Sequence, residues 1–239
     1  MARHQASERG AILRRRIRRP EQPDFSLRCG QYFQGRLRWD GALYYMPWKD
    51  YQVGVSVPGP PFNFDANVGD ARIYGIESTL EWRPLAGLRL AVTADYNNAT
   101  LRSDAFQNPS FSAVPGERLP EAPALNFNAI GRYEWNLRAA VRLFAQLDVA
   151  YKGSMWNDLR IDVRSLQPAY SIGNLRLGAS RPDGTWQAEA FISNLGNSNA
   201  VLFVNATGYD TYPGVSNPVV AVPPRTFGLR LRYRWGGTY

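Results

Sequence analysis

The sequence predicts an antiparallel, all-β chain that forms about eleven strands of a transmembrane β-barrel. From Gln31 onward, apolar and polar residues alternate with a period of two, which is typical of strands with one apolar and one polar face. Glycine and proline residues punctuate this alternation, and no segment shows the period of an amphipathic helix. With 44% hydrophobic and 13% aromatic residues, the 239-residue chain is too apolar for a disordered protein.

Each of the first four expected strands is an alternating run that ends at a turn or loop containing Gly, Pro or Asn. In order along the chain, these runs are 33–45, 51–57, 74–82 and 88–96.

The middle of the chain contains two regular strands and three weaker ones. Residues 125–135 and 141–151 alternate clearly and are joined by the turn Asn136-Leu137-Arg138. The less regular runs that follow are expected at 158–165, 170–180 and 185–193.

The C-terminal end contains the clearest alternation. A short apolar run near 200–206 precedes a Gly- and Pro-rich stretch, and the last strand is expected at 227–235. Its apolar positions are Phe227, Leu229, Leu231, Tyr233 and Trp235, and its basic positions are Arg230, Arg232 and Arg234.

The connections between these strands fall into two classes of length. If the strands are counted in order, the short turns at 47–50, 83–87, 136–138 and 194–197 lie at one end, and the loops at 58–69, 102–123 and 207–225 lie at the other. Tight turns on one rim and long loops on the other are typical of outer-membrane β-barrels. Strands of about ten residues with aromatic ends favour the same interpretation over a soluble sandwich.

The net charge of +8 is concentrated at the N-terminus. Residues 1–30 contain eight Arg against Glu8, Glu21 and Asp24, and the remainder of the chain carries little excess charge. We expect 1–30 to be a disordered basic tail around Arg14–Arg19 and 31–239 to be the folded domain, so nucleic acid is not an expected partner. The apolar run Ala11-Ile12-Leu13 is too short for a secretory signal.

Metal and catalytic sites are not expected. The single Cys and single His, Cys29 and His4, exclude a Cys/His zinc cluster and an internal disulfide. Five carboxylates on polar strand faces lack a partner His, so we interpret them as structural and expect neither enzyme activity nor a cofactor. They are Glu77, Glu81, Asp95, Glu134 and Asp148.

Four segments resemble TonB-dependent outer-membrane receptors of Gram-negative bacteria. Tyr45–Val53 is similar to the family's Trp-Lys-Asp-Ile-Gln turn, and Asn67–Glu77 is similar to its Asn-x-Gly-x-Ala-x-x-x-Gly-Val-Glu segment. Ala190–Leu195 and Pro223–Leu231 resemble later family segments, in the family's order. The resemblance covers about 31–239 and implies the C-terminal half of a barrel of 22 strands.

This resemblance implies uptake of a ferric siderophore or a similar scarce ligand, with outer-membrane lipid, the barrel-insertion machinery and an inner-membrane energy-coupling complex as partners. The expected plug domain and energy-coupling segment of a complete receptor do not match any part of the chain, so we expect a truncated fragment that does not transport. Because the terminal strand resembles the family's last strand, its aromatic and aliphatic positions are candidates for the barrel-assembly signal. Arg230, Arg232 and Arg234 are candidates for a basic ladder facing the lumen.

Two alternatives remain open on the sequence. One is a small, free-standing outer-membrane barrel or channel, since the strand count of eleven is approximate. The other is a soluble β-sandwich that binds carbohydrate through its Trp and Tyr side chains. The ligand is not determined by the sequence, because selectivity lies in loops.

Overall fold

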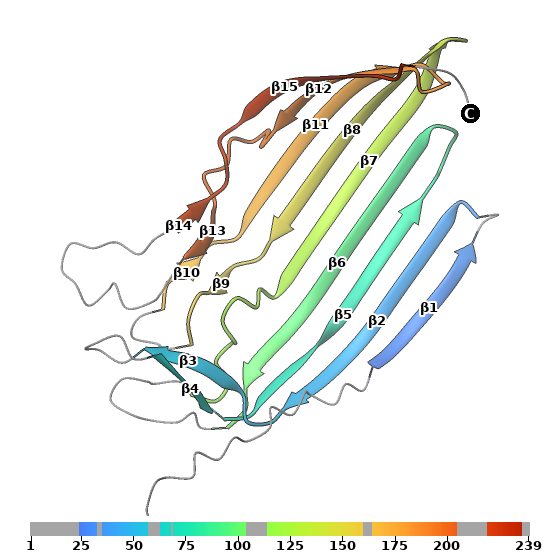
Figure 1. Cartoon of the computed structure of the whole chain (residues 1–239). Coiled ribbons are helices and arrows are strands. Elements are labelled where there is room, and N and C mark those ends of the chain that lie inside the picture. The colour runs from blue at the N-terminus through green and yellow to red at the C-terminus, as the bar shows by residue number, and fades with distance from the viewer. Residues whose placement is uncertain are drawn as a thin grey trace, which may run out of the picture.

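The computed structural model describes residues 24–32, 35–56, 63–67, 69–103, 114–159, 164–204 and 219–235. They form one open, nine-stranded antiparallel sheet, with three small two-stranded sheets near one end of its strands (Figure 1). The antiparallel all-β prediction is confirmed. Within the described residues, no helix is long and apolar enough to cross a membrane.

The main sheet is a meander in which each strand pairs with the next strand of the sheet. Its strands, in spatial order, are β1 (Asp24–Tyr32), β2 (Leu37–Trp48), β5 (Ala71–Trp82), β6 (Leu88–Leu101), β7 (Leu125–Arg138), β8 (Val141–Lys152), β11 (Tyr170–Ser180), β12 (Trp186–Ser193) and β15 (Thr226–Tyr233).

The small sheets lie within the longer connections. They pair β3 (Gln52–Ser56) with β4 (Asn63–Asn67), β9 (Met155–Trp156) with β10 (Leu166–Gln167), and β13 (Val201–Val204) with β14 (Val219–Ala221).

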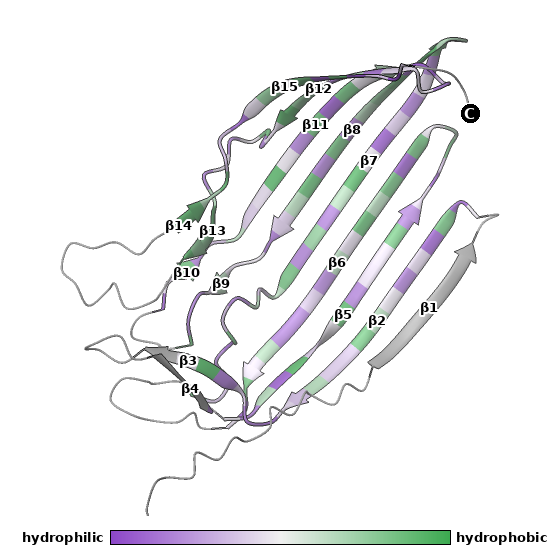
Figure 2. Cartoon of the chain, in the orientation of Figure 1, coloured by the Kyte–Doolittle hydropathy of each residue, from purple (hydrophilic) through white to green (hydrophobic). Residues whose placement is uncertain are grey.

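The register places most large apolar side chains of the main sheet on one face. Leu37 pairs with Trp82, Leu147 pairs with Leu175, and Ile192 pairs with Phe227, and pairing continues the same face from strand to strand. The hydropathy colouring shows this alternation along the long strands (Figure 2). We call this side the apolar face and the opposite side, which carries most of the charged residues, the polar face. A one-residue slip would exchange the two faces, so the pattern specifies the register.

The apolar face remains uncovered by other described residues. Leu229 and Leu231 are each 82% exposed. The small sheets lie near the ends of the long strands and do not cover this face (Figure 1). A soluble sandwich packs two sheets against each other through their apolar faces. The described residues therefore do not form the sandwich considered as an alternative.

The prediction that connection lengths differ between the two rims is confirmed, with two corrections. The short connections are β1–β2, β5–β6, β7–β8 and β11–β12, and they share one rim, the short-turn rim (Figure 1). The long connections β2–β5, β6–β7, β8–β11 and β12–β15 share the other, the long-loop rim. The turns at 47–50 and 194–197 lie on the long-loop rim, because each begins a long connection instead of joining neighbouring strands.

Three expected strands do not belong to the main sheet. The run at 51–57 corresponds to β3, which pairs with β4 because β2 already pairs with β5 over its whole length. The run near 200–206 corresponds to β13, which pairs with β14. The run at 158–165 is not a strand where it is described; β9 and β10 flank it.

The sheet also begins earlier than expected, since β1 starts at Asp24 and crosses the boundary that we placed between residues 30 and 31. The Arg-rich composition of this region conceals the short alternation of Phe25 and Leu27 with Ser26 and Arg28. Cys29 consequently lies in β1, whereas His4 and Arg14–Arg19 lie outside the described residues.

Candidate functional site

A connected polar network crosses the polar face of β7, β8 and β11. Arg132 donates hydrogen bonds to Glu134 Oε1 at 2.7 Å and to Gln146 Oε1 at 3.0 Å. Gln146 donates to Asp148 Oδ1 at 2.8 Å, and the guanidinium of Arg176 lies 3.8 Å from Asp148 Oδ2. Each carboxylate lies beside an arginine, and the neutral Gln146 side chain connects the two ion pairs. The members of this network therefore hold one another in place across three strands.

The five carboxylates considered in the sequence all lie on the polar face. Glu134 and Asp148 belong to the network described above, Glu81 lies 3.7 Å from the Arg89 guanidinium, and Asp95 accepts a hydrogen bond from Asn126 at 3.1 Å. Glu77 is paired across the strands with Asp95. Four of the five are thus accounted for by partners on the polar face.

The basic residues of the last strand are distributed over different environments. Arg230 lies 3.4 Å from Glu189, whose side chain is only 8% exposed, and approaches the Phe191 ring at 5.8 Å. Arg232 is paired across the strands with Gln187, while Arg234 lies just beyond β15, where its backbone N–H donates to the Thr185 carbonyl oxygen. Arg230 is therefore neutralised by a neighbour, and a ligand-binding role for the three arginines stays a prediction.

The apolar positions of the last strand lie on the apolar face and are strongly exposed. Phe227 is 68% exposed, and Trp235, which follows the end of β15, is 87% exposed and contacts Tyr233 edge-to-face. Leu229 and Leu231 lie between them. Among the described strands, β15 pairs only with β12, so its other edge carries free backbone hydrogen-bonding groups.

The long-loop rim carries a cluster of buried apolar residues. Ala71, Ala99 and Leu119 form its centre, and Trp48 and Tyr51 pack against it. The pKa of the Tyr51 phenol is raised, first because the side chain is buried and second because of the nearby Glu121 carboxylate. This cluster fixes the start of the β3–β4 hairpin against the end of the main sheet.

A second contact joins two long connections at the same rim. Arg164 pairs with Glu117, and its guanidinium lies over the Trp156 ring at 4.2 Å. The backbone N–H of Glu121 donates to the Trp156 carbonyl oxygen. The β6–β7 and β8–β11 connections therefore form one packed layer.

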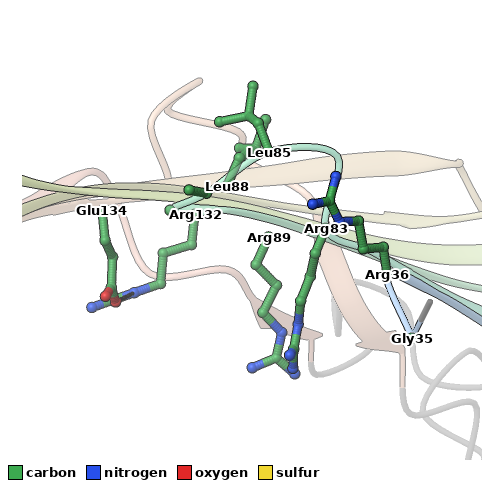
Figure 3. A pocket seen from close by; sticks show the side chains of 10 residues that line it. Gly35, Arg36, Arg83, Leu85, Leu88, Arg89, Arg132 and Glu134 are labelled. Carbon is green, nitrogen blue, oxygen red and sulfur yellow. Dashed lines mark hydrogen bonds and ion pairs between the residues drawn. The ribbon is translucent and has the colours of Figure 1, made fainter. Parts of the chain in front are cut away.

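An open pocket of about 560 Å³ lies at the short-turn rim, and we did not predict it from the sequence. Arg83, Arg89 and Arg132 extend on the same side of the sheet, and Leu85 and Leu88 lie toward the other side (Figure 3). The lining residues are Gly35, Arg36, Arg83, Leu85, Ala86, Gly87, Leu88, Arg89, Arg132 and Glu134.

Local geometry explains how this pocket forms. Gly87 has a φ of 84°, and its carbonyl oxygen accepts a hydrogen bond from Glu134 N–H, which fixes the β5–β6 turn against β7. Arg83 N–H donates to the Arg36 carbonyl oxygen, which fixes the same turn against the β1–β2 turn. The alternation identifies Arg89 and Arg132 as polar-face residues, but only the register brings them opposite each other.

No group of three or more His, Cys, Asp or Glu side chains in the described ranges could hold a metal ion.

The family comparison identifies a known barrel domain. The model of the family described as "TonB dependent receptor-like, beta-barrel" matches residues 22–195. No curated protein sequence matches the chain.

Solved structures with the same fold include receptors and transporters. The ferric yersiniabactin uptake receptor FyuA from Yersinia pestis has a TM-score of 0.65 at 18% identity, over 85% of this chain and 28% of that one. The ferric-catecholate import receptor Fiu from E. coli has a TM-score of 0.59 at 18% identity, over 84% of this chain and 25% of that one. The copper transporter OprC has a TM-score of 0.61 at 19% identity, over 88% of this chain and 30% of that one.

Proposed function

The chain belongs to the TonB-dependent receptor β-barrel family, and from this premise we propose that it forms part of the wall of an outer-membrane receptor that takes up a ferric siderophore or a similar scarce ligand. The chain spans between 25% and 30% of the length of these solved structures. The proposal therefore concerns a part of a receptor, and transport itself requires a plug and an energy-coupling segment.

The observation that carries this proposal is the uncovered apolar face of a nine-stranded sheet whose connections are sorted by length. In a membrane barrel the apolar face meets lipid and the polar face meets the lumen. The short-turn rim then faces the periplasm and the long-loop rim faces the cell exterior. The packed layer of the long connections lies on the side from which a ligand arrives.

The direction of the edge strands supports assembly with further strands. In a nine-stranded meander, β1 and β15 run in the same direction. Pairing β15 with β1, in one copy or between two copies, would create a parallel pair, whereas an odd number of additional strands closes an antiparallel barrel. A free-standing barrel built from these nine described strands alone is therefore disfavoured. The proposed partners are therefore outer-membrane lipid, the insertion machinery and the remaining receptor strands, with the energy-coupling complex in a full-length receptor.

The ligand class is proposed from the neighbours. Their names refer to ferric yersiniabactin, ferric catecholate and copper. All are scarce metals or metal chelates, and this supports uptake of such a chelate by the complete receptor.

Site-specific labelling tests the membrane orientation. In a background in which Cys29 is replaced by Ser, Val114→Cys places a thiol on the long-loop rim and Ala140→Cys places one in the β7–β8 turn. A membrane-impermeant maleimide applied to whole cells is expected to label Val114→Cys, and to label Ala140→Cys only after the outer membrane is permeabilised. Labelling of Ala140→Cys alone in intact cells would contradict the proposed orientation.

Uptake assays test the functional part. Cells that express only this chain are expected to accumulate no more radiolabelled ferric chelate than cells with an empty vector. Accumulation above that background would refute the proposal that the chain needs the rest of a receptor.

A further inference from the structure

The pocket at the short-turn rim concentrates positive charge. Its lining includes four arginines, Arg36, Arg83, Arg89 and Arg132, and one carboxylate, Glu134. Arg83, Arg89 and Arg132 come from three different segments, yet they extend on the same side of the sheet (Figure 3).

Two of these cations are paired directly across the strands. Arg89 on β6 is opposite Arg132 on β7, and like charges in directly opposite positions destabilise a sheet. Arg132 is compensated by Glu134 at 2.7 Å. Arg89 has only the looser contact with Glu81 at 3.7 Å.

The positive charges of the remaining two arginines, Arg36 and Arg83, are not neutralised by any described carboxylate. Among the described residues, the guanidinium groups of Arg36 and Arg83 form no ion pair or hydrogen bond, and both residues are exposed. Glu134 is also shared with Arg142 at 3.9 Å. On the side of the sheet to which Arg83, Arg89 and Arg132 extend, three arginines thus face two carboxylates, Glu81 and Glu134, so an anion there would relieve their mutual repulsion.

We propose that this pocket binds a phosphate group, held chiefly by Arg83 and Arg89. The planar guanidinium presents paired N–H donors that match two oxygens of a phosphate. A pocket of about 560 Å³ is larger than an inorganic ion needs, which favours a phosphate ester.

The phosphate has two possible sources, a soluble phosphate ester and the headgroup of an anionic phospholipid. The lipid source rests on the proposed membrane location. Because Arg83 and Arg89 extend on the polar side, which would face the lumen, a headgroup would have to reach them around the short-turn rim, which lies at headgroup level in a spanning sheet. The soluble source does not depend on that location. Failure of phosphate binding therefore leaves the proposed orientation to be decided by the maleimide labelling.

The test uses the full chain refolded in detergent micelles, with its β-sheet content checked by circular dichroism. Calorimetric titration with glycerol 3-phosphate measures the soluble source, and native mass spectrometry with phosphatidylglycerol against phosphatidylcholine measures the lipid source. Arg83→Gln and Arg89→Gln are expected to weaken binding about tenfold each. The matched control Arg181→Gln removes an exposed arginine of the β11–β12 turn, which lies at the same rim but outside the pocket and pairs with Asp183, and is expected to change binding less than about twofold.

Each outcome decides the proposal. Binding in either arm that depends on Arg83 and Arg89 but not on Arg181 supports it and identifies the source. Binding in neither arm, or an equal loss in all three variants, overturns it. As a second measurement in isolated outer membranes, phenylglyoxal modification of Arg83 and Arg89 is expected to be slowed by glycerol 3-phosphate while that of Arg181 is not; equal rates with and without the ester would also overturn the site.

Discussion

The side-chain amide of Asn194 donates a hydrogen bond to the carbonyl oxygen of Pro223 at 2.9 Å, which joins the two ends of the β12–β15 connection. The same amide donates to the Ser198 carbonyl oxygen at 2.9 Å, and Ser198 N–H donates back to Asn194 Oδ1 at 2.8 Å. Asn194 is 3% exposed and has a φ of 51°, a conformation that asparagine tolerates better than most residues. One side chain thus closes the base of a long loop.

Replacing Asn194 by Ala is expected to lower the free energy of unfolding by about 1–3 kcal/mol, because the three hydrogen bonds of its buried side chain are lost. Asn194→Asp keeps the acceptor and loses the donor, so its loss is expected to be smaller. The measurement is urea unfolding in detergent micelles, followed by tryptophan fluorescence. Asn197→Ala is the control: Asn197 has the same φ of 51° but accepts a single bond from Arg225 N–H. An equal effect of both alanine variants would contradict the role given to Asn194.

The β2–β5 connection is closed in a similar way. Tyr51 N–H donates to the Gly69 carbonyl oxygen at 2.7 Å, and the Gln52 side chain donates to Asn67 Oδ1 at 2.8 Å. The four sequence segments that resemble the receptor family therefore meet in two pairs, each at the base of a long connection. The four segments that resemble the family therefore lie where the chain leaves the main sheet and where it returns to it.

The apolar face yields a direct prediction about lipid contact. Leu147→Arg on β8 is expected to cost about 2–4 kcal/mol of membrane stability, because Leu147 is 44% exposed on that face and an arginine there would contact lipid. Asn128→Arg on β7, on the polar face, is expected to cost less than about 1 kcal/mol. The fraction of chain that inserts into phospholipid vesicles, measured by protease protection, distinguishes the two. Equal insertion of both variants would mean that the faces are assigned the wrong way round or that neither meets lipid.

The long strands were predictable because each has one apolar face, and a period of two is visible in a single sequence. The β5–β6 hairpin shows this well, since the strands and the turn at 83–87 all lie close to their expected positions. The turn at 47–50 was harder, because a tight turn that joins neighbouring strands and one that begins a long excursion have the same local sequence. Asp50, the last residue of this turn, has a φ of 54°.

The phosphate pocket could not be predicted from the alternation alone. Periodicity places Arg89 and Arg132 on the polar face, but it does not say which residue of the next strand lies opposite. The pocket also requires Arg83 and Arg36, which lie beside turns and obey no period. The assembly signal in the last strand and the basic ladder are different, since both were identified from one strand and stay predictions.

Gly228 allows close packing of an aromatic ring on the polar face. A Cβ atom at this position would lie 2.2 Å from Phe191 Cζ, so the ring of Phe191 covers the glycine directly opposite it on β15. Gly228→Ala is expected to destabilise the chain by about 1–3 kcal/mol, because the ring must move out of its position. In a Phe191→Leu background, Gly228→Ala should lower the free energy of unfolding much less. Urea unfolding of the two single variants and the double variant forms a double-mutant cycle that measures the coupling energy between the two residues.

Gly131→Ala provides the control for this cycle. A Cβ atom on Gly131 would meet only Leu90 Cδ2 at 3.4 Å, so the substitution is expected to change stability little. If Gly228→Ala costs the same in the presence and absence of the Phe191 ring, the ring is not the cause.

Tyr51 is expected to make stability depend on alkaline pH. Its pKa is raised above the ordinary value of about 10, because burial and Glu121 both oppose the charged phenolate. A raised folded-state pKa means that the contribution is fully present below pH ~10 and is lost as pH rises through the folded-state pKa. Absorbance titration at the tyrosinate band should show a late-titrating phenol that disappears in Tyr51→Phe, and Glu121→Gln should make that phenol titrate earlier. If Tyr51→Phe removes only a phenol that titrates normally, the loop cluster does not bury Tyr51 in solution.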